Sequence, residues 1–252
     1  MSPTLSRILW GIIMVTSLRA DWLHDAISTY NEGNYTEALR LEKHACDRNI
    51  SQGCTMAALA YVQARGVERN FSRSAHYYQR GCDLGDPMAC AGLAGQLIEG
   101  RGLGQDVPRG ILLLKQSCDS GVAFSCYMMG SLYVSGTPGL EANVTRSIVY
   151  LEKSCDLNMS EGCIAAGGLH ASGQGIPPDD SRAFALYSKA CQLNNPTGCL
   201  GQGMAYAEGK GTPIDLAQAK LYLNRACQQK APHACEVLHG LQADEAARRK
   251  KK

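Results

Sequence analysis

The sequence contains twelve cysteines, and they fall into six pairs with one spacing. Seven residues separate the two cysteines of every pair, and the pairs recur at steps of 36, 36, 37, 36 and 36 residues. The pairs are Cys46/Cys54, Cys82/Cys90, Cys118/Cys126, Cys155/Cys163, Cys191/Cys199 and Cys227/Cys235. A constant period of this size is typical of a protein built from stacked repeats. Cysteines that all belong to such pairs favour an oxidising compartment.

Each repeat begins with a pattern typical of an α-helix. Counted from the second cysteine of a pair, the residue at +4 is always small and the residue at +7 is mostly large. The +4 residues are Ala58, Ala94, Gly130, Gly167 and Gly203, and the +7 residues are Tyr61, Leu97, Tyr133, His170 and Tyr206. A cysteine and residues at +4 and +7 lie on one helical face, so we expect a helix here, helix A.

A glycine turn and a second helix complete the repeat. Glycine accepts the left-handed backbone at a helix end, as expected at Gly66, Gly100 and Gly173. A residue that favours the N-cap follows at a fixed position. These residues are Asn70, Asp106, Asn143, Asp179 and Asp215. The second helix, helix B, is expected to run from this cap to the first cysteine of the next pair, for example over residues 70–82. The extra residue of the 37-residue step lies in the turn at 136–140.

The first twenty residues have the pattern of a secretory signal. Arg7 supplies positive charge, Ile8 to Leu18 is an apolar run of eleven residues, and Ala20 precedes a plausible cleavage site. The run is shorter than the ~20 residues that span a bilayer. We therefore expect a secreted or periplasmic protein, cleaved near Ala20 and without a transmembrane segment.

The charge balance excludes one class of partner. The net charge is +2, and the tail at 248–252 alone contributes five basic residues, which leaves −3 on the rest. This gives no large basic surface, so we expect no nucleic-acid binding. We assign residues 1–20 to the signal peptide, 21–240 to the repeat array and 241–252 to a disordered basic tail. An anchor to an anionic surface is the alternative for the tail.

The repeat resembles a known family. Its pattern is Cys-x-x-x-Gly-x-x-Tyr-x-x-Gly-x-Gly, a capping Asp and Tyr-x-x-Ala-Cys, which resembles the Sel-like repeat (SLR) family, a relative of tetratricopeptide repeats. With a cysteine pair at every junction, the chain is most similar to the Helicobacter cysteine-rich proteins (Hcp). The resemblance covers roughly residues 22–240. It implies secreted or periplasmic α/α solenoids, some of which carry a penicillin-binding or β-lactamase label.

The fold class expected is therefore all-α. We predict a right-handed α/α superhelical solenoid of about six disulfide-stapled helix hairpins plus a closing helix. Two cysteine pairings are geometrically reasonable: Cys46 with Cys54, which joins helix B to the next helix A, or Cys54 with Cys82, which closes one hairpin. The resemblance implies the first. Zinc is disfavoured, because seven intervening residues exceed the usual two to four and no histidine recurs. We expect no metal and no cofactor.

No motif in the chain carries a reaction. The Ser-x-x-Lys, Ser-Asp-Asn and Lys-Thr-Gly motifs of serine β-lactamases are missing from the sequence. The histidines are scattered, and His170 stands at the packing position +7. We predict no catalytic residue and a protein that is not an enzyme. A β-lactamase-like hydrolase is implied by the resemblance alone.

The repeat architecture favours binding. Stacked helices A line the concave side of such solenoids and form an extended groove. The groove residues predicted here are Leu59, Gln63, Glu99, Tyr127, Ser131, Met204 and Glu208. Packing against the next helix is the alternative role for some of these positions. We predict a scaffold that binds a protein or extended peptide. The alternatives are an Hcp-type protein that binds β-lactams or cell-wall fragments, or hydrolyses β-lactams weakly, and an intermembrane-space assembly factor.

Overall fold

The computed structural model describes residues 22–250, with side chains up to residue 245. The predicted signal peptide, residues 1–20, lies outside the described residues. The described part consists of α-helices, with no strand in it beyond one isolated β-bridge between Thr137 and Leu140. It falls into two compact units, which divide between Ser120 and Gly121. None of the described helices is both long and apolar enough to cross a membrane.

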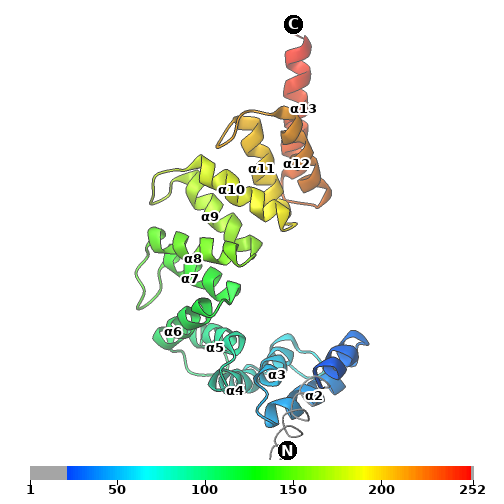
Figure 1. Ribbon diagram of the computed structural model, residues 1–252, viewed down its shortest axis with the longest axis vertical. Coiled ribbons are helices and arrows are strands. Elements are labelled where there is room, and N and C mark those ends of the chain that lie inside the picture. The colour runs from blue at the N-terminus through cyan, green and yellow to red at the C-terminus, as the bar shows by residue number, and fades with distance from the viewer. Residues whose placement is uncertain (1–21, 251–252) are drawn as a thin grey trace, which may run out of the picture. The chain divides into compact units, whose positions relative to one another are not determined.

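The helices follow one another in pairs along both units, as Figure 1 shows. Unit 1 contains a helix at 22–31, α2 (Tyr35–Asp47), α3 (Ser51–Gln63), α4 (Phe71–Asp83), α5 (Pro87–Glu99) and α6 (Val107–Asp119). Unit 2 contains α7 (Ala123–Ser135), α8 (Val144–Asp156), α9 (Ser160–Ser172), α10 (Asp180–Gln192), α11 (Pro196–Glu208), α12 (Leu216–Gln228) and α13 (Ala234–Lys250). The odd-numbered helices α3 to α11 are helices A, and the even-numbered helices α2 to α12 are helices B. This all-α repeat architecture confirms the predicted fold class.

Each helix B begins at a side-chain cap. The carboxylate or amide oxygen accepts a backbone N–H from the first helical turn, for example Asn70 from Arg73 at 2.9 Å and Asp179 from Arg182 at 2.9 Å. All five predicted caps form such bonds, and Asn34 caps α2 in the same way. These bonds satisfy N–H groups that have no partner inside the helix. The caps therefore set where every helix B starts.

Within each unit, disulfides join a helix B to the next helix A. In the five bridges Cys46–Cys54, Cys82–Cys90, Cys155–Cys163, Cys191–Cys199 and Cys227–Cys235, the Cα atoms lie 4.5 to 4.7 Å apart. Cys118 and Cys126 are also disulfide-bonded, so no cysteine is free. This is the pairing that the family resemblance implies. We call two helices joined in this way a stapled pair.

Small residues lie beside the bridges. The residue before the second cysteine meets the residue before the first, as in Gly53 against Ala45 and Gly198 against Ala190. A Cβ atom on Gly53 would lie 2.6 Å from the Cβ of Ala45, closer than two carbon atoms can approach. The two backbones are therefore almost in contact where the disulfide forms. This close approach places the cysteines within bonding distance.

The opposite end of a stapled pair is closed by a glycine. Gly66 and Gly102 have positive φ angles of 67° and 80°, and each lies against the first residue of the helix B in its own pair, Tyr35 or Phe71. A Cβ atom at either glycine would collide with the backbone of that residue. Gly211 packs on Asp180 in the same way. The second glycine of the turn is thus needed for contact as well as for its backbone angle.

Two details differ from the sequence expectation. The left-handed residue at the end of α3 is Ala64, with φ 57° and ψ 41°, whereas α5, α9 and α11 end on the expected glycines. In addition, α13 continues to Lys250, whereas the sequence analysis expects a disordered tail from residue 241. Residues 241–250 include three Ala and two Arg, which favour helices, and Lys220 on α12 pairs with Glu245 at 2.7 Å.

Candidate functional site

The helices A present the surface on which we predicted binding. Within unit 1, α3 contacts α5, and within unit 2, α9 contacts α11. The residues at +4 are all buried, whereas the residues at +9 are all exposed to solvent. These exposed residues are Gln63, Glu99, Ser135, Ser172 and Glu208. The +9 positions are therefore free of the packing that holds the helices together.

The predicted groove residues divide into two groups by exposure. Gln63, Glu99, Met204 and Glu208 are exposed. Leu59, Tyr127 and Ser131 are partly buried. Tyr127 packs against the cluster that contains Leu151 and Cys155, and Ser131 donates a hydrogen bond from its Oγ to the Tyr127 carbonyl oxygen at 3.0 Å. Tyr127 and Ser131 thus contribute to the packing of α7.

Salt bridges offset the acidity of this surface. The carboxylate of Glu99 lies 2.8 Å from the Nε of Arg101, and that of Glu208 lies 2.8 Å from the Nζ of Lys210. Both pairs are exposed, so solvent screens them and they contribute little to stability.

A pocket of about 240 Å³ lies on unit 1, between the helix at 22–31, α2 and α3. Its lining is mostly apolar and aromatic, with three polar side chains. The lining residues are Ile27, Tyr30, Tyr35, Ala38, Glu42, Met56, Leu59, Ala60, Gln63 and Arg65. Two of the predicted groove residues, Leu59 and Gln63, belong to it. The pocket therefore extends the helix A surface of α3 towards the N-terminal helix.

Glu42 is the unusual residue of this pocket. Its side chain is 4% exposed, and its Oε2 atom is buried without a hydrogen-bond partner. Burial raises the pKa of the Glu42 carboxyl to about 7. The Arg65 guanidinium lies over the Tyr30 ring, 4.9 Å from its centroid, and Tyr30 meets the edge of Tyr35 at 5.1 Å between ring centroids.

The sequence analysis missed Glu42, although the repeat contains the signal. Glu42 stands four residues before the first cysteine of its pair. In the five other repeats this position holds Tyr78, Leu114, Leu151, Tyr187 and Leu223. Three of these side chains, on Leu114, Leu151 and Leu223, have at most 1% of their surface exposed. A carboxyl group at a position reserved for a large packed side chain marks this repeat as different from the rest.

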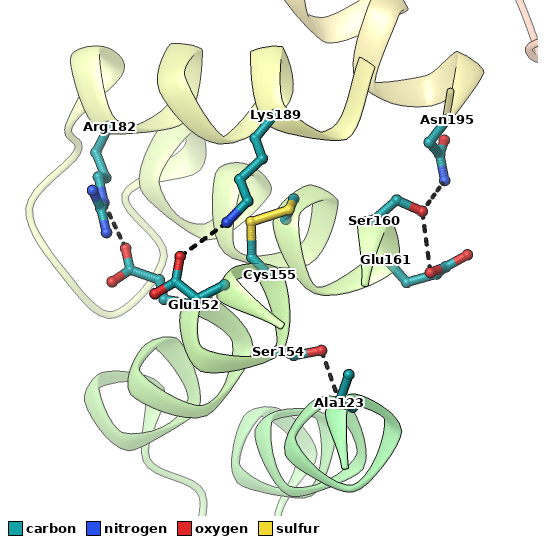
Figure 2. The surroundings of a disulfide bond; sticks show 11 residues. Ala123, Glu152, Ser154, Cys155, Ser160, Glu161, Arg182, Lys189 and Asn195 are labelled. Carbon is teal, nitrogen blue, oxygen red and sulfur yellow. Dashed lines mark hydrogen bonds and ion pairs between the residues drawn. A yellow bond between two sulfur atoms is a disulfide. The ribbon is translucent and has the colours of Figure 1, made fainter. Parts of the chain in front are cut away.

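A polar cluster lies on unit 2, near the bridge between Cys155 and Cys163. Glu152 Oε1 accepts from His170 Nε2 at 3.1 Å and from Arg182 Nε at 2.8 Å. Figure 2 shows Arg182 reaching Glu152 from the neighbouring helix. The hydrogen bond from Arg182, and then that from His170, lowers the pKa of Glu152 against the opposing effect of burial. The side chain of His170 is 14% exposed.

The hydrogen bonds of this cluster link neighbouring helices. Glu152, His170 and Arg182 come from α8, α9 and α10, so the shared carboxylate connects three consecutive helices. His170 and four further charged or hydroxyl residues border an open depression of about 640 Å³. Those residues are Thr145, Asp179, Asp180 and Ser181, and all four are exposed. Within residues 22–245, no three His, Cys, Asp or Glu side chains are grouped to hold a metal.

Comparison with known proteins identifies the repeat. The family model described as "Sel1 repeat" matches residues 52–86, 87–122, 123–159, 160–195 and 200–230. Among solved structures, a Sel1 repeat protein from Oxalobacter formigenes aligns with a TM-score of 0.73 and 24% identity, over 81% of this chain and 59% of that one. A protective antigen present in uropathogenic Escherichia coli strains, described as displaying an SLR fold, aligns with a TM-score of 0.77 and 20% identity, over 87% and 48%.

A third structure is the cysteine-rich protein B of Helicobacter pylori. It has 30% identity over 53% of this chain and 96% of that chain, with a TM-score of 0.42. A search of curated proteins found no match. This chain spans less than two thirds of the length of the first two structures. At 24% and 20% identity, the Oxalobacter formigenes and Escherichia coli structures show similarity of fold alone.

Proposed function

Because this chain belongs to the Sel1 repeat family, we propose that it is a binding scaffold for a protein or extended peptide. The partner is held on the surface formed by the helices A. Stacked repeats of this kind bury their shared core between neighbouring helices and leave one long surface for recognition. The proposed partner is a segment of polypeptide that lies across several helices A.

The observation that carries the proposal is the pattern of exposure along these helices. From α3 to α11, the +4 residue is buried and the +9 residue is exposed. The buried positions hold only Ala or Gly, whereas the exposed positions hold Gln, Glu or Ser. Packing between helices explains the small residues at +4, but it does not explain the polar residues at +9. Most of these polar side chains form only local contacts, such as Glu99 with Arg101 and Ser135 with the Ser131 carbonyl oxygen. Exposed polar side chains of this kind suit a peptide backbone, which presents both donors and acceptors.

The disulfides support a location outside the reducing cytosol. Every cysteine is oxidised, and such bridges persist in secreted and periplasmic proteins. The apolar segment at Ile8 to Leu18 supports export, because it has the length and flanking charge of a signal peptide. We therefore propose a secreted or periplasmic scaffold, with cleavage near Ala20.

Site-specific photo-crosslinking tests this proposal. A benzophenone amino acid is placed at Gln63 or Glu99 in unit 1, and at Met204 or Glu208 in unit 2. Matched controls carry it at Lys115 and Asn224, which are exposed on helices B. The oxidised protein is crosslinked in extracts of the secreted or periplasmic fraction. We expect one protein, identified by mass spectrometry, to be captured at the helix A positions and not at the controls. Equal capture at both sets of positions would contradict the proposal.

A further inference from the structure

The pocket on unit 1 has one carboxyl group in an apolar setting. Glu42 on α2 replaces the large apolar side chain that the other repeats place at this position. Around it are Tyr30 and Tyr35 and, from α3, Met56 and Leu59. A buried carboxyl group without a hydrogen-bond partner is unfavourable for folding, because it loses its contacts with water and gains none in return. Its presence here is explained if a ligand supplies the missing partner.

None of the groups that face Glu42 forms a hydrogen bond with its buried Oε2 atom. The other titratable residues of the lining are Tyr30 from the helix at 22–31, Tyr35 from α2 and Arg65 after α3; the part of the lining from α3 itself contains none. No ion pair joins Arg65 to Glu42 among the described side chains, and the Arg65 guanidinium instead covers the Tyr30 ring. Arg65 is exposed, so solvent screens its charge.

We propose that this pocket binds a primary alkylammonium group, the side chain of a lysine in the partner polypeptide. The ammonium group pairs with the Glu42 carboxylate, and such charge-assisted hydrogen bonds are among the strongest in proteins. The methylene chain lies against Met56 and Leu59, and the ring of Tyr35 adds cation–π attraction. The identity of the ligand as part of a polypeptide rests on the proposed function, whereas the recognition of an alkylammonium group does not.

Binding of a cation must change the protonation of Glu42. Below pH 7 the carboxyl is mostly protonated, because burial raises its pKa to about 7. An alkylammonium ion binds the ionised form, so binding at pH 6 releases the Glu42 proton to solvent. The affinity should therefore rise with pH up to about 7 and then level off. A pocket that used Glu42 as a neutral hydrogen-bond donor would show the opposite dependence.

Small probes test the inference without the partner. Titration calorimetry of the oxidised protein with n-butylammonium chloride should show saturable binding, with proton release at pH 6. n-Butanol, the neutral probe of similar shape, should bind at least tenfold more weakly. Glu42→Gln should reduce the affinity for butylammonium at least tenfold. The matched control Glu68→Gln, an exposed carboxylate of the same unit with the same change in charge, should not reduce it.

The variant is suited to the test because glutamine is neutral and nearly the same size, so folding at pH 7 is preserved. Equal binding of butanol and butylammonium, or full binding by Glu42→Gln, would overturn the inference. These results are independent of the crosslinking experiment. Crosslinking without butylammonium binding would leave the scaffold proposal standing alone, and butylammonium binding without a crosslinked protein would leave the pocket standing alone.

Discussion

At the scale of single residues, most positions follow the repeat pattern, and the residues that depart from it have specific structural consequences. Glu42 occupies a core position and is 4% exposed, yet it lacks a partner for Oε2. Ala64 adopts a left-handed backbone that other repeats assign to glycine. Both residues lower the stability of the N-terminal repeats in ways that can be measured. Glu42 does so through its charge, and Ala64 through its Cβ atom.

Glu42 should make stability depend on pH. Its folded pKa of about 7 lies above the ordinary value of 4.5, so the folded state binds more protons than the unfolded state between these values. The free energy of unfolding should therefore fall as pH rises from about 4.5 to 7, by about 3 kcal/mol at most. Urea unfolding at pH 5 and pH 8 should show this loss in the wild type. Glu42→Gln should show a smaller loss and greater stability at pH 8. An unchanged pH profile in the variant would contradict the assignment.

Ala64 should be improved by glycine. A non-glycine residue in the left-handed region costs about 1 kcal/mol, and Ala64 is exposed, with φ 57°. Ala64→Gly should therefore raise the free energy of unfolding by about 0.5–1 kcal/mol. Gly100 is the C-cap of the next helix A, with φ 69°, so the reverse change Gly100→Ala should lower stability. Thermal unfolding should show opposite changes in stability for the two variants. A loss of stability in Ala64→Gly would contradict the cost assigned to the left-handed backbone of Ala64.

At the scale of elements, the stapled pair is the structural unit. A side-chain cap starts helix B, small residues let the two helices approach, a disulfide joins them, and a glycine closes the far end. The clusters of small and large side chains then fill the space between consecutive helices. Thirteen residues suffice for each of α2 to α12, because both ends of a pair are held by specific contacts. A helix of this length is marginal in isolation.

Gly102 should be the sensitive glycine of its turn. It has φ 80°, and a Cβ atom there would collide with the backbone of Phe71. Gly104 lies two residues later, with no positive φ and no atom within 4 Å of an added Cβ. Gly102→Ala should therefore lower stability by about 2 kcal/mol or more, whereas Gly104→Ala should be neutral or slightly stabilising. Chemical denaturation compares them, and equal effects would show that the contact with Phe71 is not required.

At the scale of the whole molecule, stability is distributed over many similar units. Each repeat depends chiefly on its own staple and on its neighbours along the chain, as expected for a repeat protein. The core contains many Ala and Cys residues and few aromatic side chains, so each helix pair buries little apolar area. The disulfides offset this by restricting the unfolded chain. The disulfides therefore contribute to the stability of the helix A surface on which the proposed function depends.

Removal of one bridge should act locally. The loop between Cys191 and Cys199 is short, with a separation of 8, so its closure should contribute about 2.5 kcal/mol in the chain-entropy treatment. The double variant Cys191→Ala, Cys199→Ala should lose about this much stability. Hydrogen exchange should quicken in α10 and α11 and stay unchanged in α2 to α5. Uniform loss of protection throughout the chain would indicate that the repeats unfold as one cooperative body.

Many structural features of this protein can be predicted from its sequence alone. The 36-residue period, the small residue at +4 and the capping Asn or Asp can all be recognised in the sequence, and the caps act through hydrogen bonds within a few residues. The helical repeat could therefore be predicted, and so could the positions of the caps. Other features depend on which atoms meet across helices, and no local pattern specifies those distances. They include the near contact of Gly53 with Ala45, the closure of the turn by Gly102 on Phe71, and the pocket around Glu42. Burial gives Glu42 its raised pKa, and burial exists only once the helices have packed.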